Sequence, residues 1–167
     1  MKTVYFAHGK ESGPWGIKIQ RLAKVAEGYG LKVISPDYLD LSDPDERVAR
    51  LMGLLASEPA LEQVVLVGSS LGGYISTVAA SQLPVGGLFL MAPALHYPGQ
   101  PIDHRVSHCP VCVVHAWRDE VIPVEQAIRF CQQGSHALHL LDSDHRLTSA
   151  LEEIEAIFSR FLETLLH

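Results

Sequence analysis

A serine between two glycines carries the clearest chemical signal in the sequence. Ser70 lies at the centre of Gly68-Ser69-Ser70-Leu71-Gly72, which matches the pattern G-x-S-x-G. In that pattern the serine sits on a sharp turn from a strand into a helix, and the small flanking residues avoid collisions with adjacent backbone. A serine exposed in this way can attack an acyl carbonyl once a base removes its proton. We therefore predict Ser70, and not Ser69, as a nucleophile.

The segments on either side of the motif fit this interpretation. The apolar run 64–67 precedes it, and an amphipathic pattern that begins near Leu71 follows it. The free N–H groups of a new helix would also stabilise negative charge on a substrate oxygen. Because a pattern this short matches many proteins by chance, a phosphate loop or a plain tight turn is the alternative. Neither G-x-G-x-x-G nor G-K-S/T is present, which disfavours a phosphate loop.

A serine nucleophile needs a histidine base, and the base needs an acid that orients it and stabilises its positive charge. Asp119 follows the apolar run 111–115, and His145 follows the run 138–141. The candidates therefore occur in the order Ser70, Asp119, His145, each after a run that could form a strand. Because the carboxyl ends of parallel strands meet at one edge of a sheet, this order predicts a catalytic triad.

Other acids and histidines compete with this assignment. Glu120 is the nearest rival, but Asp119 is favoured because H-x-x-x-D-x-x-I-P places it ahead of the bend that Pro123 helps to define. Asp142 and Asp144 have simpler roles as turn formers or helix caps. The other histidines lie in apolar runs, in the irregular segment 92–108, or at surface and terminal positions: His96, His104, His108, His115, His136, His139 and His167.

The end of the first apolar run offers a second part of the site. His8 and Gly9 follow the run 4–7, where another backbone N–H is needed to complete an oxyanion hole. We expect the backbone N–H groups of Lys10 and Leu71 to form that pair, although an ordinary strand-to-loop turn would also explain His-Gly. Residues that could line a substrate pocket, or equally pack in the core, are His8, Gly9, Trp15, Leu95 and Tyr97.

Short apolar runs alternate with longer amphipathic stretches along the whole chain. This alternation is typical of βα units around a mainly parallel sheet with helices on both faces. We predict six strands, at 4–7, 32–35, 64–67, 88–91, 111–115 and 138–141. Helical spacing of apolar residues predicts helices at 15–29, 48–55, 71–79 and 147–165, with a fifth at 124–130. The predicted class is α/β with three layers, α/β/α, in a single domain over residues 1–167.

Composition excludes several kinds of protein. The 167 residues are 47% hydrophobic and 19% charged, which is far from the composition of disordered chains. A net charge of -6, with no stripe of Lys or Arg, disfavours a nucleic-acid partner. No apolar stretch approaches the roughly 20 residues of a membrane span, and no secretory apolar region follows Lys2. We therefore expect a protein of the cytoplasm with no membrane partner.

Three cysteines raise a metal or redox alternative. Cys109 and Cys112 form C-x-x-C, with His104 and His108 upstream, while Cys131 stands alone. An odd number of cysteines suits a reducing compartment better than a disulfide framework. If a strand begins near residue 110, its extended geometry separates the two cysteines too far for a zinc knuckle. We expect a structural role, no metal and no cofactor, although a turn at this position would restore the metal hypothesis.

The chain resembles the α/β-hydrolase superfamily, and within it the small, lid-poor serine esterases of bacteria. The motifs that carry the resemblance span nearly the whole chain: His8-Gly9, Pro36-Asp37-Tyr38, Gly68 to Gly72, Asp119 to Pro123, and Asp144-His145. The resemblance implies a compact hydrolase core with strand order 2-1-3-4-5-6, an acyl-serine intermediate and no cofactor. The chain departs from the family pattern because it starts at the His-Gly strand, without the two antiparallel strands that usually open the fold.

The function expected from these residues is the hydrolysis of carboxylic esters of small substrates. Thioesterase or amidase activity at the same site is one alternative, and a catalytically silent hydrolase fold used for binding is another. The segment 92–108 is rich in proline and too short for a helical cap domain, so small soluble substrates should enter freely. The expected partner is a small-molecule ester or thioester, and the sequence predicts no oligomeric state.

Overall fold

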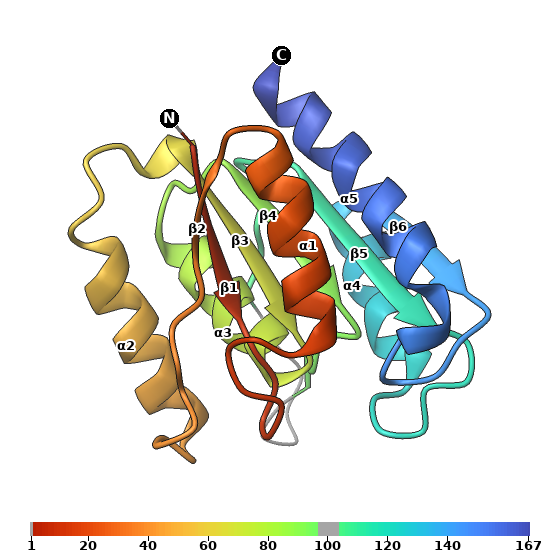
Figure 1. Ribbon diagram of the computed structural model, residues 1–167. Coiled ribbons are helices and arrows are strands. Elements are labelled where there is room, and N and C mark those ends of the chain that lie inside the picture. The colour runs from red at the N-terminus through yellow and green to blue at the C-terminus, as the bar shows by residue number, and fades with distance from the viewer. Residues whose placement is uncertain (1, 97–103) are drawn as a thin grey trace.

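A parallel β-sheet forms the centre of the molecule in the computed structural model, which describes residues 2–96 and 104–167. Within these residues the sheet has six strands in the order β2-β1-β3-β4-β5-β6, and every neighbouring pair is parallel (Figure 1). The strands are β1 (Thr3–Ala7), β2 (Lys32–Ile34), β3 (Val64–Ser69), β4 (Gly87–Met91), β5 (Val111–Ala116) and β6 (Ala137–Leu141). The predicted number of strands and their order are confirmed.

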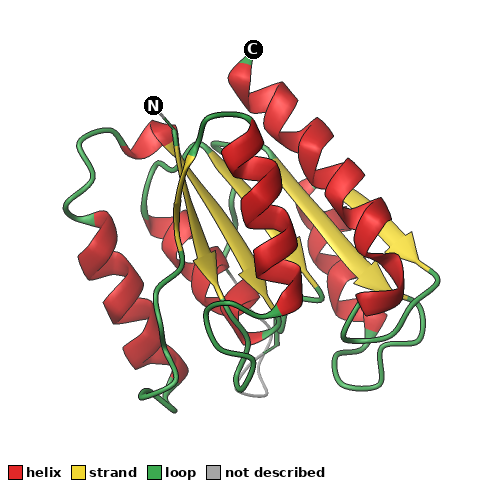
Figure 2. Ribbon diagram, in the orientation of Figure 1, coloured by secondary structure: helices red, strands yellow, loops and turns green. Residues whose placement is uncertain are grey.

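Helices cover both faces of this sheet (Figure 2). In the described part of the chain they are α1 (Ile17–Gly28), α2 (Pro44–Leu55), α3 (Leu71–Gln82), α4 (Val124–Gly134) and α5 (Leu151–Leu166), with short 3₁₀ turns at Leu61–Gln63 and Thr148–Ala150. Helices α1 and α5 pack together on one face, while α2, α3 and α4 lie on the other. The predicted three-layer α/β/α class is therefore confirmed.

Side chains of the strands alternate between two hydrophobic cores, one on each face. In β1, Val4 and Phe6 face α1 and α5, whereas Tyr5 and Ala7 face α2 and α3. The same alternation holds in the other central strands, because successive side chains of a strand point to opposite faces. Phe89 in β4 packs against Phe158 and Phe161 of α5, with ring centroids 4.9 Å and 5.5 Å away. The apolar runs that form β1, β3, β4 and β5 are thus strands buried on both sides, whereas the edge strands β2 and β6 are only partly buried.

Two helices begin later than the apolar spacing predicted. Helix α1 starts at Ile17 rather than near Trp15, because Gly13 adopts a positive φ of 72° and Gly16 is extended, so the chain turns before it can coil. Helix α5 starts at Leu151 because Leu147 also has a positive φ, 61°, and a 3₁₀ turn follows it. Leu147 is nevertheless fully buried, so its apolar character reports the core and not the helix.

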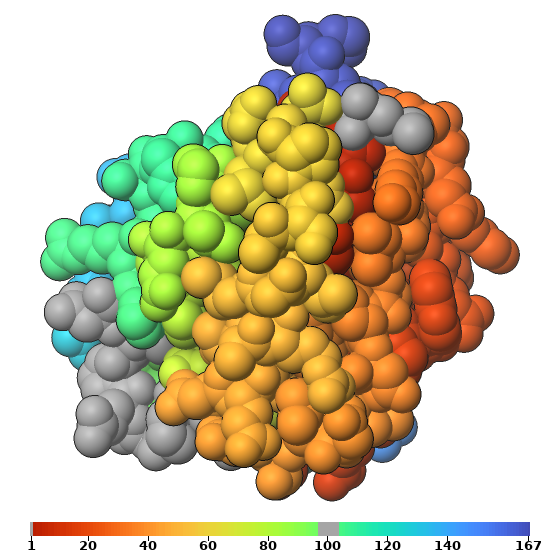
Figure 3. All heavy atoms as spheres, turned by 90° about the vertical axis from the view of Figure 1, so that its left-hand side faces the viewer, coloured from red at the N-terminus to blue at the C-terminus, as the bar shows by residue number. Residues whose placement is uncertain are grey.

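All six strands end at the same edge of the sheet, the lower edge in Figure 1. The loops after β1, β3, β5 and β6 therefore meet there, as expected for an open parallel sheet. Helix α2 packs against α3 on the β2 side of the molecule, where it runs along the surface in the space-filling view (Figure 3). No helix in the described residues is long and apolar enough to span a membrane.

Candidate active site

Ser70 stands on a strained turn between β3 and α3. Its φ of 54° and ψ of -115° lie outside the regions that a serine normally adopts, which costs on the order of 1–3 kcal/mol. The turn requires glycine on both sides: a Cβ at Gly68 would overlap the Gly72 carbonyl, and one at Gly72 would overlap the Ala7 carbonyl. The close approach at Gly72 also brings the start of α3 against the end of β1. Two separate parts of the site are thereby placed side by side.

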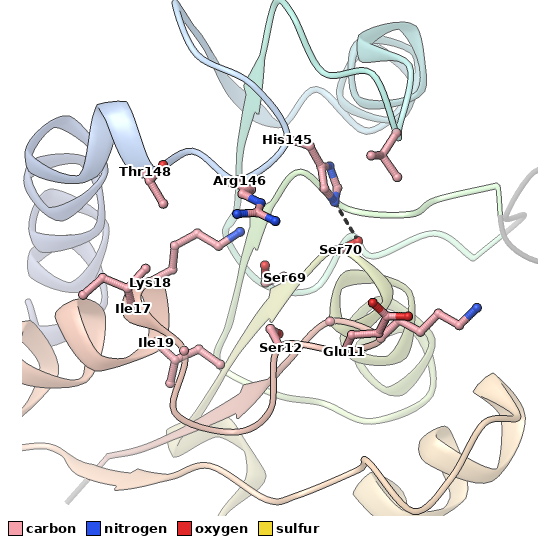
Figure 4. A pocket seen from close by; sticks show the side chains of 14 residues that line it. Glu11, Ser12, Ile17, Lys18, Ile19, Ser69, Ser70, His145, Arg146 and Thr148 are labelled. Carbon is pink, nitrogen blue, oxygen red and sulfur yellow. Dashed lines mark hydrogen bonds between the residues drawn. The ribbon is translucent and has the colours of Figure 1, made fainter.

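Three side chains form a continuous line of hydrogen bonds at this edge. Ser70 Oγ lies 3.2 Å from His145 Nε2, and His145 Nδ1 lies 2.7 Å from Asp119 Oδ2. The contact between Ser70 and His145 is drawn in Figure 4. The loops after β3, β6 and β5 supply the three residues. The structure thus brings Ser70, His145 and Asp119 together, whereas Glu120 is exposed.

The carboxylate of Asp119 is fully buried and receives hydrogen bonds on both oxygens. Oδ1 accepts from the backbone N–H groups of Val121 and Ile122, at 2.9 Å and 2.8 Å. Oδ2 faces His145 and also lies 3.1 Å from His115 Nε2. These donors compensate the cost of burying a negative charge. These contacts fix the Asp119 side chain in a position from which it can orient His145.

His115 is a buried neutral histidine beneath this carboxylate. Burial lowers the pKa of His115, and its Nε2 lies near two acceptors, Asp119 Oδ2 and the Ile122 carbonyl at 3.0 Å. Its Nδ1 has no hydrogen-bond partner among the described residues. The single proton therefore belongs on Nε2. His115 is thus a fixed N–H donor to the acid.

The loop after β1 is oriented through its carbonyl groups. The Gly9 carbonyl accepts hydrogen bonds from His8 Nδ1 at 2.6 Å and from Arg47 at 3.2 Å, and Arg47 also donates to the Lys10 carbonyl at 3.2 Å. In a trans peptide the C=O of Gly9 and the N–H of Lys10 point in opposite directions. Among the described residues, the backbone N–H groups of Lys10 and Leu71 have no hydrogen-bond partner. Both are available to a ligand oxygen.

His8 connects this loop to the segment after β2. The imidazole is fully buried, and its Nε2 accepts a hydrogen bond from the Tyr38 backbone N–H at 2.9 Å. Burial is the main cause that lowers the pKa of His8, so the ring is neutral with its proton on Nδ1. His8 therefore fixes the loop from below and does not face the substrate space.

A pocket of about 700 Å³ opens beside Ser70 and His145. Gly9 lies on its wall, as the sequence suggested, and Lys10, Lys18 and Arg146 add positive charge to the lining. The other suggested pocket residues lie elsewhere. His8 and Leu95 are buried below the surface, and Trp15 is 51% exposed outside the lining. Tyr97 lies outside the described residues.

The cysteines of the C-x-x-C motif lie at the start of β5. Cys112 is buried within the strand and Cys109 precedes it, and both are free thiols. Burial raises the pKa of Cys109 to about 11 and of Cys112 to about 12, so neither is a ready thiolate. In residues 2–96 and 104–167 no group of three or more His, Cys, Asp or Glu could hold a metal ion.

Two residues that support the site, His115 and Arg47, were not predicted from the sequence. His115 stood in the H-x-x-x-D pattern used to choose the acid, so its spacing from Asp119 was the available signal. Arg47 had no such signal, because its partner Gly9 lies 38 residues away and only the folded chain brings them together. Arg47 is 2% exposed, which is rare for arginine unless its charge is hydrogen-bonded.

Solved structures of several other proteins have the same architecture as this chain. A protein of the alpha/beta hydrolase superfamily from Xanthomonas campestris pv. campestris is 35% identical, with 98% of this chain and 99% of that chain covered and a TM-score of 0.90. Est1E from Butyrivibrio proteoclasticus is 16% identical over 99% of this chain and 88% of its own, with a TM-score of 0.85. A methylesterase from Arabidopsis is 17% identical over 98% and 100%, with a TM-score of 0.77.

Family membership follows from the sequence and from the fold together. No curated protein matches the chain. Residues 2–109 match the uncharacterised protein family UPF0227, which is more than half of the chain. The 35% identical relative extends the similarity over nearly the full length. The chain therefore belongs to family UPF0227 and to the alpha/beta hydrolase superfamily.

Proposed function

We propose that this hydrolase cleaves carboxylic esters of small substrates through an acyl-serine intermediate. The observation that carries the proposal is the hydrogen-bonded line from Ser70 through His145 to Asp119, beside two backbone N–H groups without partners. Serine hydrolases are recognised by this geometry and by the roles of the residues. A complete set of catalytic groups disfavours a fold used only for binding.

Each of these groups has one role in the proposed reaction. Ser70 Oγ attacks the ester carbonyl carbon while His145 Nε2 takes the hydroxyl proton. The carbonyl oxygen becomes an oxyanion that accepts hydrogen bonds from the N–H groups of Lys10 and Leu71. As the intermediate collapses, the bond to the alcohol breaks and His145 returns the proton to the departing oxygen. The acyl group remains on Ser70.

Water completes the cycle by the same steps. His145 removes a proton from water, whose oxygen attacks the acyl carbonyl, and the resulting oxyanion occupies the same two N–H groups. Collapse then releases the carboxylic acid and returns the proton to Ser70 Oγ. Asp119 holds the ring of His145 so that Nε2 faces the reacting atoms and stabilises the positive charge it gains.

Structural neighbours support an ester of a small molecule as the substrate. Est1E has been observed with ferulic acid bound, and another neighbour is a methylesterase. The pocket of about 700 Å³ beside Ser70 lies in the size range of small-molecule sites. We propose esters ahead of thioesters and amides on this basis.

The decisive experiment separates Ser70 from its neighbour Ser69. We expect Ser70→Ala to lose labelling by a fluorophosphonate probe and to lower kcat on p-nitrophenyl esters by about 10³-fold or more. Ser69→Ala should keep both labelling and most of the activity, since the Ser69 side chain is buried and the hydrogen bond to His145 comes from Ser70 Oγ. Circular dichroism should show both variants folded. Labelling of folded Ser70→Ala would move the nucleophile elsewhere.

A further inference from the structure

Two of the three cationic residues that line the pocket beside Ser70 face the same space. Lys18 comes from the first turn of α1, and Arg146 follows His145 directly in the chain. Both line the pocket, and in Figure 4 their charged groups point into the space on one side of Ser70. Neither side chain forms a hydrogen bond or an ion pair within the part of the chain that the structure describes. The catalytic groups do not use this charge.

The acidic residues nearest to these cations already have other partners. Asp119 is fully engaged by His145, His115 and backbone N–H groups. Asp144 accepts a hydrogen bond from the Arg146 backbone N–H through Oδ1 at 3.1 Å. The carboxylate of Glu11, which also lines the pocket, lies on the opposite side of Ser70 in Figure 4. Residues 2–96 and 104–167 therefore supply no direct counter-ion for the Lys18 ammonium.

Keeping the Lys18 ammonium charged at this position costs free energy when no anion lies beside it. Desolvation lowers the pKa of Lys18 to about 8, and the charges of Asp119 and Asp144 only partly oppose this effect. The ammonium is nevertheless mostly protonated at neutral pH. A poorly hydrated cation with no hydrogen-bonded partner gains more from an incoming anion than an exposed lysine would.

We propose that Lys18 and Arg146 bind a carboxylate or phosphate group of the substrate, so that the ester cleaved at Ser70 carries a negative charge. The planar guanidinium can receive two oxygens of such a group, and the ammonium adds a point charge. Ile17 and Ile19 also line the pocket and would contact an apolar chain between the anion and the ester. This inference rests on the proposed ester hydrolysis and specifies its substrate class.

The test compares charged and neutral esters of equal length. The p-nitrophenyl half-esters of succinate, glutarate and adipate carry the anion on the acyl half, and butyrate, pentanoate and hexanoate esters are their neutral counterparts. An acetate ester of 4-hydroxybenzoate, against phenyl acetate, places the anion on the leaving half. We expect the kcat/KM of wild type to be higher for the anionic ester than for its neutral counterpart in at least one of these two comparisons.

Substitution of the cations should remove this preference. Lys18→Met keeps the apolar stem and should lower the ratio about tenfold, the usual effect of one charged hydrogen bond. Arg146→Gln should lower it several-fold, because its side chain is more exposed. Lys24→Gln on the outer part of α1 and Arg129→Gln on α4 change the net charge equally and should leave the ratio unchanged. Neutral esters report any general damage to the triad.

A binding measurement separates failure of the subsite from failure of the esterase proposal. Calorimetry with Ser70→Ala should detect glutarate or inorganic phosphate, and the stronger ligand identifies carboxylate or phosphate as the group. Lys18→Met in the same background should weaken that binding about tenfold. If the esters are hydrolysed but the anionic-to-neutral ratio of kcat/KM is the same in wild type, Lys18→Met and Arg146→Gln, the anionic subsite alone would be overturned. Anion binding without any ester hydrolysis would overturn the proposed reaction and leave the subsite standing.

Discussion

The carboxylate of Asp119 is held by hydrogen-bond donors on both of its oxygens. Two backbone N–H groups hold Oδ1, and His145 and His115 share Oδ2. The backbone bonds come from Val121 and Ile122, so the turn after β5 fixes the rotamer of the acid. His115 differs from the two backbone donors because a side chain supplies its hydrogen, and it differs from His145 because it makes no hydrogen bond to Ser70. It can therefore be changed without altering the backbone.

Removal of the His115 donor should weaken the hold on the Asp119 carboxylate while the carboxylate itself stays in the site. We expect His115→Phe to lower kcat about tenfold, because the carboxylate loses one of its hydrogen bonds and its orientation loosens. His115 donates to Asp119, so its loss leaves more negative charge facing His145, and the acid limb of the pH–rate profile should move to higher pH. His115→Gln retains an N–H donor and should recover part of the activity. An unshifted profile in folded His115→Phe would assign His115 to packing alone.

At the scale of elements, helix α2 supports the loop that carries the proposed oxyanion donor. Asp43 caps the helix through the Asp45 backbone N–H at 3.0 Å, and Pro44 suits its first turn. One turn later Arg47 points inward and donates to the carbonyls of Gly9 and Lys10. The position of the Lys10 N–H therefore depends on Arg47 of α2.

Loss of Arg47 should affect both stability and catalysis. Arg47→Met leaves buried carbonyls without a donor, which we expect to cost about 1–3 kcal/mol of unfolding free energy in urea denaturation. The loop should also loosen, so kcat should fall about 10²-fold while KM changes less, because the oxyanion forms only along the reaction.

Arg50 provides the matched control on the same helix. It is paired with Asp40 at the surface, at 2.6 Å, so Arg50→Met should leave the urea denaturation midpoint and kcat close to those of wild type. A folded Arg47→Met with the kcat of wild type would refute a role for α2 in positioning the loop.

Elements were predictable where one physical cause dominated the sequence pattern. The four central strands are buried on both faces, so each appears as an apolar run, and the bounds of all six strands agree with the prediction within one or two residues. The start of α5 was not predictable from spacing, because Leu147 satisfies the helical pattern while it fills the core from a left-handed backbone conformation. Core burial and helix periodicity produce the same apolar residue there.

In the molecule as a whole, the order of residues along the chain predicted the three candidate catalytic residues, but it did not predict the residues that hold them in place. Ser70, Asp119 and His145 each follow a strand, and the parallel sheet brings all strand ends to one edge. Arg47 and Lys18 come from helices, where a charged residue normally indicates only a solvated face. Their roles depend on how α1 and α2 pack, which no local pattern in the sequence records.

Two buried neutral histidines connect distant parts of the chain and should make its stability depend on pH. His8 joins the end of β1 to Tyr38, and His115 joins β5 to the turn at Ile122. Burial is the main cause that lowers the pKa of both below the ordinary value of 6.5. As the pH falls through about 6.5, the unfolded chain binds protons that the folded chain does not. The contribution of the two neutral histidines to the free energy of unfolding is therefore fully present above this pH and is lost progressively below it.

Urea denaturation between pH 7.5 and 5.5 tests this linkage. Each histidine kept neutral by the fold adds up to about 1.4 kcal/mol per pH unit to the slope. His8→Gln can keep a donor and an acceptor but cannot titrate, so we expect lower stability at pH 7.5 and a flatter slope. His108 is exposed, and His108→Gln should reproduce the wild-type slope. If His8→Gln and wild type lose stability in parallel, His8 must bind its proton equally well in both states, and its neutral hydrogen-bonded role at the end of β1 would be wrong.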